Sequence, residues 1–136
     1  MRHKRSLLLI FWLLGILFPV AWLANFSNRY RQIFNAIFAP EWMHWLTHAA
    51  LYAGLAILMI VVFNLPLNRR TVRRVLGVVL LVGMIHEGMQ LFSAGQTISW
   101  NSVFDLGVDL IGSGIGLGVV WVGVAILDPL KKQSIS

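Results

Sequence analysis

The chain has 136 residues, of which 58% are hydrophobic and 12% are charged, and its formal net charge is +6. Soluble domains carry about 25% charged residues, so this composition indicates an integral membrane protein, with residues 1–136 forming a single domain. The lack of cysteine excludes disulfide bonds and thiolate metal sites. The positive charges flank apolar runs and are not interleaved with aromatic residues, so we expect the lipid bilayer as a partner and no nucleic acid.

Four apolar runs have about the length that crosses a bilayer as an α-helix. They cover about residues 6–24, 42–63, 75–92 and 103–127. The first run follows a basic segment, as a signal peptide does. However, bulky Trp22 would stand three residues before the cleavage point, which favours a retained anchor. The sequence therefore predicts an all-α fold, a polytopic transmembrane bundle of four helices.

The basic residues predict how this bundle is oriented. All Lys and Arg residues except Arg29 and Arg31 lie in the N-terminal tail, the 64–74 loop or the C-terminal tail. Cytoplasmic segments carry an excess of Lys and Arg. We therefore expect a multi-pass protein of the inner (plasma) membrane with both termini cytoplasmic.

Two further patterns concern packing. Between the first two spans, apolar residues recur with a helical period: Tyr30, Ile33, Phe34, Ile37 and Phe38. This predicts a short helix near residues 29–39, which either lies on the outer leaflet or packs across the mouth of the bundle. The last span carries overlapping G-x-x-x-G patterns at Gly112, Gly114, Gly116 and Gly118. Small residues at this spacing let helices approach closely, and we expect packing within the bundle rather than dimerisation.

Each of the last three spans carries polar residues on one helical face. These residues are His44, His48 and Tyr52, then His86, Glu87 and Gln90, and finally Asp105 and Asp109. A charged group at mid-bilayer costs roughly 2.5–3.5 kcal/mol. The predicted topology places all three groups in the outward half of the bundle, so we expect them to face one another or a wet cavity.

Several kinds of chemistry fit such a cluster. A Glu87 carboxyl group beside His48 or His86 is a general acid–base arrangement, and it would relay protons in a transporter. His44 and His48 have the spacing of a helical zinc pair, with Glu87 or Asp105 as a third ligand. The protease motif H-E-x-x-H is absent, and we assign neither a metal nor a cofactor.

A nucleophilic serine is not evident, because Ser93 and Ser102 are expected in loops. The polar side chains also fit a purely structural lock between helices. A proton-coupled transporter is a further alternative, but four spans without broken-helix repeats argue against it.

The polar residues stand in the order His48-x-x-x-Tyr52, Glu87-x-x-Gln90 and Asp105-x-x-x-Asp109-x-x-Gly112. Over about residues 42–118 this pattern resembles that of VanZ-like proteins, small bacterial membrane proteins of several helices, some of them associated with resistance to the glycopeptide teicoplanin. The resemblance implies polar site positions at His48, Tyr52, Glu87, Gln90 and Asp105. The chain departs from the family at His44, Gln96 and Asp109, where an acidic residue, Arg and Asn are common.

We therefore expect a VanZ-like protein of the cell envelope whose outward-facing polar site binds or acts on an envelope lipid or lipid-linked precursor. We place the chemistry on His48, Glu87 and Asp105. The expected orienting residues are Tyr52, Gln90, Asp109, His44 and His86. Whether the protein is an enzyme is left open, and the alternatives are a non-catalytic assembly or binding module and a proton-coupled transporter.

Overall fold

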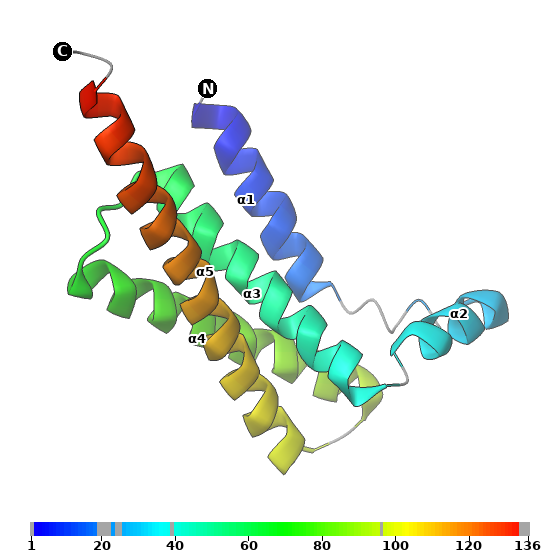
Figure 1. The fold of residues 1–136 in the computed structure, drawn as a ribbon. Helices are drawn as coiled ribbons and strands as arrows, with labels where there is room; N and C mark the ends of the chain where they lie inside the picture. Colours follow the sequence, from blue (N-terminus) through cyan, green and yellow to red (C-terminus); the bar gives the residue numbers. More distant parts are fainter. Residues whose placement is uncertain (1, 19–22, 24–25, 39, 96, 134–136) are drawn as a thin grey trace.

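The computed structural model describes residues 2–18, 23, 26–38, 40–95 and 97–133. In this part of the chain the regular structure is helical, which confirms the predicted all-α fold class (Figure 1). The helices are α1 (Arg2–Leu17), α2 (Asn28–Phe38), α3 (Glu41–Phe63), α4 (Arg69–Ala94) and α5 (Trp100–Gln133).

Three of these helices are long and apolar enough to cross a membrane, over Glu41–Phe63, Arg69–Ser93 and Trp100–Ile126. They contain nearly all of the predicted spans 42–63, 75–92 and 103–127. The helix α4 begins earlier than predicted because the side chain of Asn68 caps it, accepting a hydrogen bond of 2.9 Å from the Thr71 N–H. The predicted first span, 6–24, includes residues 19–22 and 24, which lie outside the described residues.

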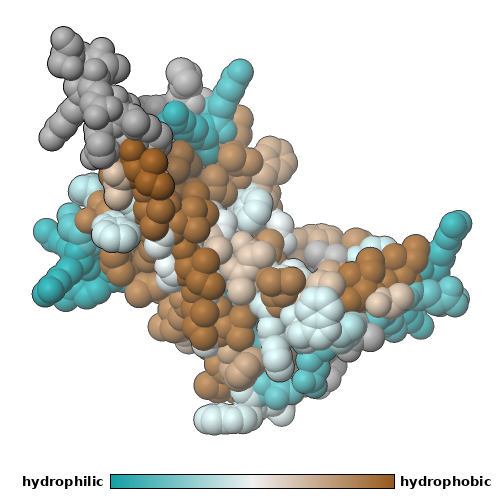
Figure 2. Space-filling view, viewed as in Figure 1, coloured by the Kyte–Doolittle hydropathy of each residue, from teal (hydrophilic) through white to brown (hydrophobic). Residues whose placement is uncertain are grey.

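The outer surface of the bundle is apolar, as a lipid-facing surface requires. Figure 2 shows a band of hydrophobic atoms over α5, while hydrophilic atoms gather where α4 begins. The exposed face of α5 carries Ile111, Ile115, Val119 and Val122. Their spacing of three or four residues places them on one side of the helix. Together with the three long helices, this surface indicates a membrane protein.

The helices α3 and α5 pack closely because two glycines of α5 leave room for the α3 backbone. A Cβ atom at Gly112 would collide with the backbone of Ala49, and one at Gly116 would collide with Ala53. At Gly114 and Gly118 a Cβ atom would meet nothing within 4 Å. One of the two G-x-x-x-G patterns therefore sets the approach of α5 to α3, and the other lies on an open face.

The two N-terminal helices cover α3. The Trp12 side chain of α1 packs on Gly54 and donates a hydrogen bond of 2.8 Å from Nε1 to the Leu51 carbonyl oxygen. The helix α2 matches the short helix predicted near residues 29–39, and none of its residues is buried. Its aromatic rings contact one another along one face, with a Phe34–Phe38 centroid distance of 4.6 Å.

Figure 1 places the start of α1 and the end of α5 at the same end of the bundle, near the connection from α3 to α4. The start of α3, the end of α4 and the start of α5 lie at the opposite end. The helices α3 and α5 therefore run parallel to each other, and α4 runs antiparallel to both. This arrangement brings the polar faces of the three helices together.

Candidate functional site

The structure brings all eight predicted site residues into one cluster between α3, α4 and α5. His44 and Gln90 are half-buried. The other members are buried: His48, Tyr52, His86, Glu87, Asp105 and Asp109. Asp109 has no exposed surface at all, at 0%. The cluster is therefore built into the bundle and is not a solvated face.

Two histidine–aspartate pairs join α3 to α5. His44 Nε2 lies 3.2 Å from Asp105 Oδ2, and His48 Nδ1 lies 2.9 Å from Asp109 Oδ1. Residues four apart share a helical face, and each pair spans the same sequence separation of 61 residues. The parallel helices therefore pair in register, one turn after another.

A third contact continues the same register. The Ser113 hydroxyl lies 3.2 Å from the Tyr52 carbonyl oxygen and 2.9 Å from the carbonyl oxygen of Asp109. Ser113 is fully buried, and sequence reasoning missed it. Its position four residues after Asp109 was the available signal, because that spacing puts it on the polar face of α5.

On α4, His86 has partners at both ring nitrogens. Gln90 Nε2 lies 2.7 Å from His86 Nε2, and an amide N–H can only donate, so this ring nitrogen accepts. The other nitrogen, Nδ1, then carries the hydrogen and lies 3.5 Å from the Tyr52 hydroxyl. The His86 ring also stacks on His48, with centroids 5.3 Å apart.

From the sequence we expected an imidazole of His48 or His86 to donate a hydrogen bond to the Glu87 carboxyl group, and the structure differs from this expectation. Among the described residues, neither His48 nor His86 donates to it, and its buried Oε1 has no hydrogen-bond partner. The side chain beside the carboxyl group is that of Ser102. Ser102 lies in α5 and is buried, and Ser93 lies in α4, so the expectation that these serines are loop residues was wrong.

Asp109 is a second carboxylate with an unpaired oxygen. Its Oδ1 binds His48, but its buried Oδ2 has no hydrogen-bond partner among the residues described. A Cβ atom on Gly83 would lie 2.8 Å from Oδ2. The glycine on α4 thus leaves the space that this carboxylate occupies.

A cavity of about 460 Å³ opens beside the cluster. The polar part of its lining includes His44, His48, Glu87, Gln90 and Asp105. The apolar part comes from α1 and the residue after it, and from α2, α3 and α4, with Ile16, Phe18, Phe34, Phe38, Leu51 and Leu91. Because α2 contributes two phenylalanines, this helix lies beside the cavity as well as on the surface.

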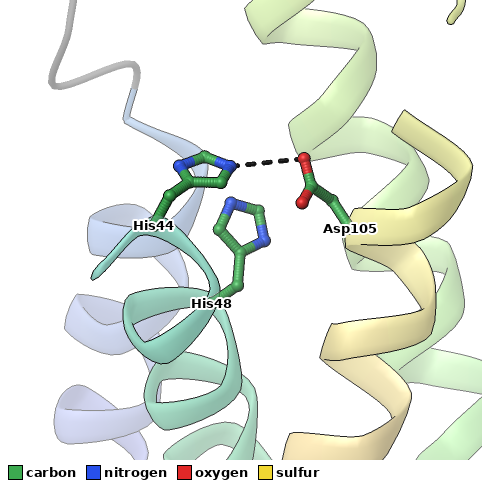
Figure 3. A group of neighbouring side chains, drawn as sticks. All are labelled: His44, His48 and Asp105. Atoms are coloured by element: carbon green, nitrogen blue, oxygen red, sulfur yellow. Dashed lines mark hydrogen bonds and ion pairs between the residues drawn. The ribbon is translucent and has the colours of Figure 1, made fainter. Parts of the chain in front are cut away.

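Three of the polar residues that line the cavity carry atoms that could bind a metal ion. His44, His48 and Asp105 each provide one such atom, and these atoms lie within 4.8 Å of one another. Figure 3 shows the three side chains pointing toward a common region from α3 and α5.

A scan against protein-family models, a search of curated proteins and a search of solved structures each find no match to this chain.

Proposed function

We propose that the chain is a VanZ-like protein of the bacterial cell envelope whose cavity binds an envelope lipid or a lipid-linked envelope precursor. The observation that carries this proposal is the cavity of about 460 Å³, whose lining combines histidines and carboxylates with aromatic and aliphatic side chains. An amphiphile matches this lining, because its chain can contact the aromatic and aliphatic side chains while its headgroup reaches the histidines and carboxylates.

The proposed topology has four spans with α1 as the first, in the inner membrane, and with both termini cytoplasmic. It rests on the distribution of Lys and Arg in the sequence. In this orientation the α3–α4 connection faces the cytoplasm together with the first turns of α4, which carry Arg69, Arg70, Arg73 and Arg74. The cavity then opens in the outer half of the bilayer, where an envelope lipid or precursor presents its headgroup.

The charges of the cavity indicate which part of the headgroup is recognised. The described residues that line it include Glu87 and Asp105 but no Lys or Arg. Hydroxyl or amino groups of a headgroup would donate hydrogen bonds to these carboxylates. We assign contact with the ligand to His48, Glu87 and Asp105, while His44, Tyr52, His86, Gln90 and Asp109 orient them.

A structural lock is the second candidate, because four contacts between α3, α4 and α5 favour it. These contacts are His44–Asp105, His48–Asp109, Tyr52–His86 and Ser113–Tyr52. Hydrogen bonds between membrane helices contribute about 0.6 kcal/mol each on average. Substitution of Glu87 distinguishes ligand binding from a structural lock. Its Oε1 has no hydrogen-bond partner within the described residues, so this atom makes no interhelical hydrogen bond.

The test compares Glu87→Gln with Glu41→Gln. Both changes remove one carboxylate, but Glu41 is exposed and does not line the cavity of Glu87. Purified proteins are incubated with a bacterial polar-lipid extract, and bound lipid is measured by native mass spectrometry. In parallel, teicoplanin susceptibility is measured in a bacterial host that expresses each variant at equal membrane abundance.

We expect Glu87→Gln to lose the bound lipid and the teicoplanin tolerance, and Glu41→Gln to keep both. Thermal stability in detergent should remain at the unmodified level for both variants. If Glu87→Gln keeps lipid and tolerance, the proposed ligand site is wrong. If it loses them only together with thermal stability, the structural lock is the better account. If the unmodified chain binds lipid without changing teicoplanin susceptibility, the link to glycopeptides fails while the lipid site stands.

A further inference from the structure

We infer that His44, His48 and Asp105 bind a divalent transition-metal ion, with Zn²⁺ as the best-matched ion, at the wall of the cavity. This inference goes beyond the proposed function, because metal binding requires no lipid or precursor. Two imidazoles and one carboxylate form a ligand set that suits Zn²⁺ and other first-row ions, whereas Mg²⁺ and Ca²⁺ prefer oxygen ligands.

The distances between ligand atoms support one shared ion. Zinc bonds of about 2.0–2.1 Å in tetrahedral geometry place neighbouring ligand atoms about 3.3 Å apart. His44 Nε2 and Asp105 Oδ2 are 3.2 Å apart, and ligand atoms of all three residues lie within 4.8 Å of one another. One pair of ligand atoms therefore already has the zinc spacing, and binding requires the separations from His48 to shorten to about 3.3 Å.

The hydrogen bond between His48 and Asp109 prepares His48 as a ligand. The Asp109 carboxylate accepts from His48 Nδ1 at 2.9 Å, so Nδ1 carries the hydrogen and Nε2 keeps its lone pair. Metal-binding histidines commonly donate their other N–H to a carboxylate in this way. Figure 3 shows one ring nitrogen of His48 turned toward His44.

The remaining histidine of the cluster is not available as a ligand. Both ring nitrogens of His86 have partners, at Tyr52 and Gln90. His48 and His86 therefore form a matched pair for mutagenesis, because both line the cavity but only His48 is a proposed ligand. The three proposed ligands leave a fourth tetrahedral position, and all three line the same cavity as Glu87. Three protein ligands with one open position are typical of catalytic rather than structural zinc sites.

The test measures metal binding by the full-length protein in detergent, purified with a tag that contains no histidine. Zn²⁺ stoichiometry is measured by elemental mass spectrometry after dialysis, and affinity by titration against a chelating dye, with Mg²⁺ as the hard-ion comparison. The variants are His48→Ala, Asp105→Ala, Asp109→Asn and His86→Ala. Each must keep its helical circular dichroism and elute as a single species.

We expect one Zn²⁺ per chain for the unmodified protein and no displacement of zinc by Mg²⁺. His48→Ala and Asp105→Ala should lose stoichiometric zinc, while His86→Ala should retain it. Asp109→Asn should bind zinc about 10–100-fold more weakly, since it removes the carboxylate that orients His48.

A Co²⁺ titration of the unmodified protein keeps the inference testable where a variant fails to fold. A tetrahedral Co²⁺ absorption spectrum supports the site, and an octahedral spectrum overturns it. Less than stoichiometric zinc on the unmodified chain also overturns it. Retention of stoichiometric zinc by His48→Ala and Asp105→Ala would likewise show that the three assigned residues are not the ligands.

Discussion

The substitution Gly112→Ala tests whether the close approach of α5 to α3 positions the polar cluster. A Cβ atom at Gly112 would lie 2.6 Å from Ala49 Cα, whereas carbon atoms in contact are about 3.5–4.0 Å apart. The two helices must therefore separate by roughly 1 Å. The contacting atoms belong to the backbone and cannot rotate away, so we expect a cost at the upper end of overpacking, about 3 kcal/mol.

Alanine also gains about 1 kcal/mol over glycine from its higher helix propensity. The net effect of Gly112→Ala should then be about 2 kcal/mol of destabilisation. The matched control is Gly114→Ala, because a Cβ atom there meets nothing within 4 Å. This control should gain about 1 kcal/mol, so the two variants should differ by about 3 kcal/mol.

The assay unfolds the purified protein by SDS titration in mixed micelles and monitors unfolding by tryptophan fluorescence. A separation of roughly 1 Å would also stretch the His48–Asp109 contact from 2.9 Å to beyond hydrogen-bond distance. Loss of ligand or zinc binding should therefore accompany the loss of stability in Gly112→Ala but not in Gly114→Ala. Equal stability of the two variants would refute this account of the α3–α5 interface.

Two further predictions concern α1 and the orientation of the bundle. Trp12→Phe removes the 2.8 Å hydrogen bond to the Leu51 carbonyl oxygen and also the indole atoms Cε2, Cζ2 and Cη2 that lie beside Gly54, so we expect more than the about 0.6 kcal/mol of one hydrogen bond to be lost in the same SDS titration. A loss of about 0.6 kcal/mol or less would show that packing of the indole ring on Gly54 does not hold α1. A C-terminal alkaline phosphatase fusion, active only outside the cytoplasm, should be silent, while a C-terminal fluorescent fusion that folds in the cytoplasm should be bright. The opposite result would reverse the proposed topology.

The sequence predicts the helices and their polar faces because both depend on local periodicity. The positions of His44, His48 and Tyr52 at successive turns require only that α3 is a helix, and the same holds for Asp105 and Asp109 on α5. The same periodicity places Gly112 and Gly116, seven residues after Asp105 and Asp109, on the polar face of α5, and Gly114 and Gly118 on another face. The pairing between the two helices is not local, because the sequence does not show which turn of α3 lies beside Asp105.

The hydrogen-bond partners could not be predicted for a related reason. Glu87 follows His86 directly in the sequence, yet the two side chains leave α4 about 100° apart. His86 therefore turns toward Tyr52 and Gln90 instead of donating to its neighbour. Ser102 was missed because the start of α5 at Trp100 precedes the apolar run that marked the predicted span.

The polar cluster contains two parts with different energetic roles. The His44–Asp105 and His48–Asp109 pairs join α3 to α5, as a structural lock would. A buried polar atom without a hydrogen bond costs about 1–3 kcal/mol, more than one interhelical hydrogen bond contributes on average. Glu87 Oε1 and Asp109 Oδ2 are such atoms in the part of the chain described. Of these two atoms, only Glu87 Oε1 belongs to a residue that lines the cavity, so the proposed ligand would offset the cost at Glu87 and leave the cost at Asp109 unchanged.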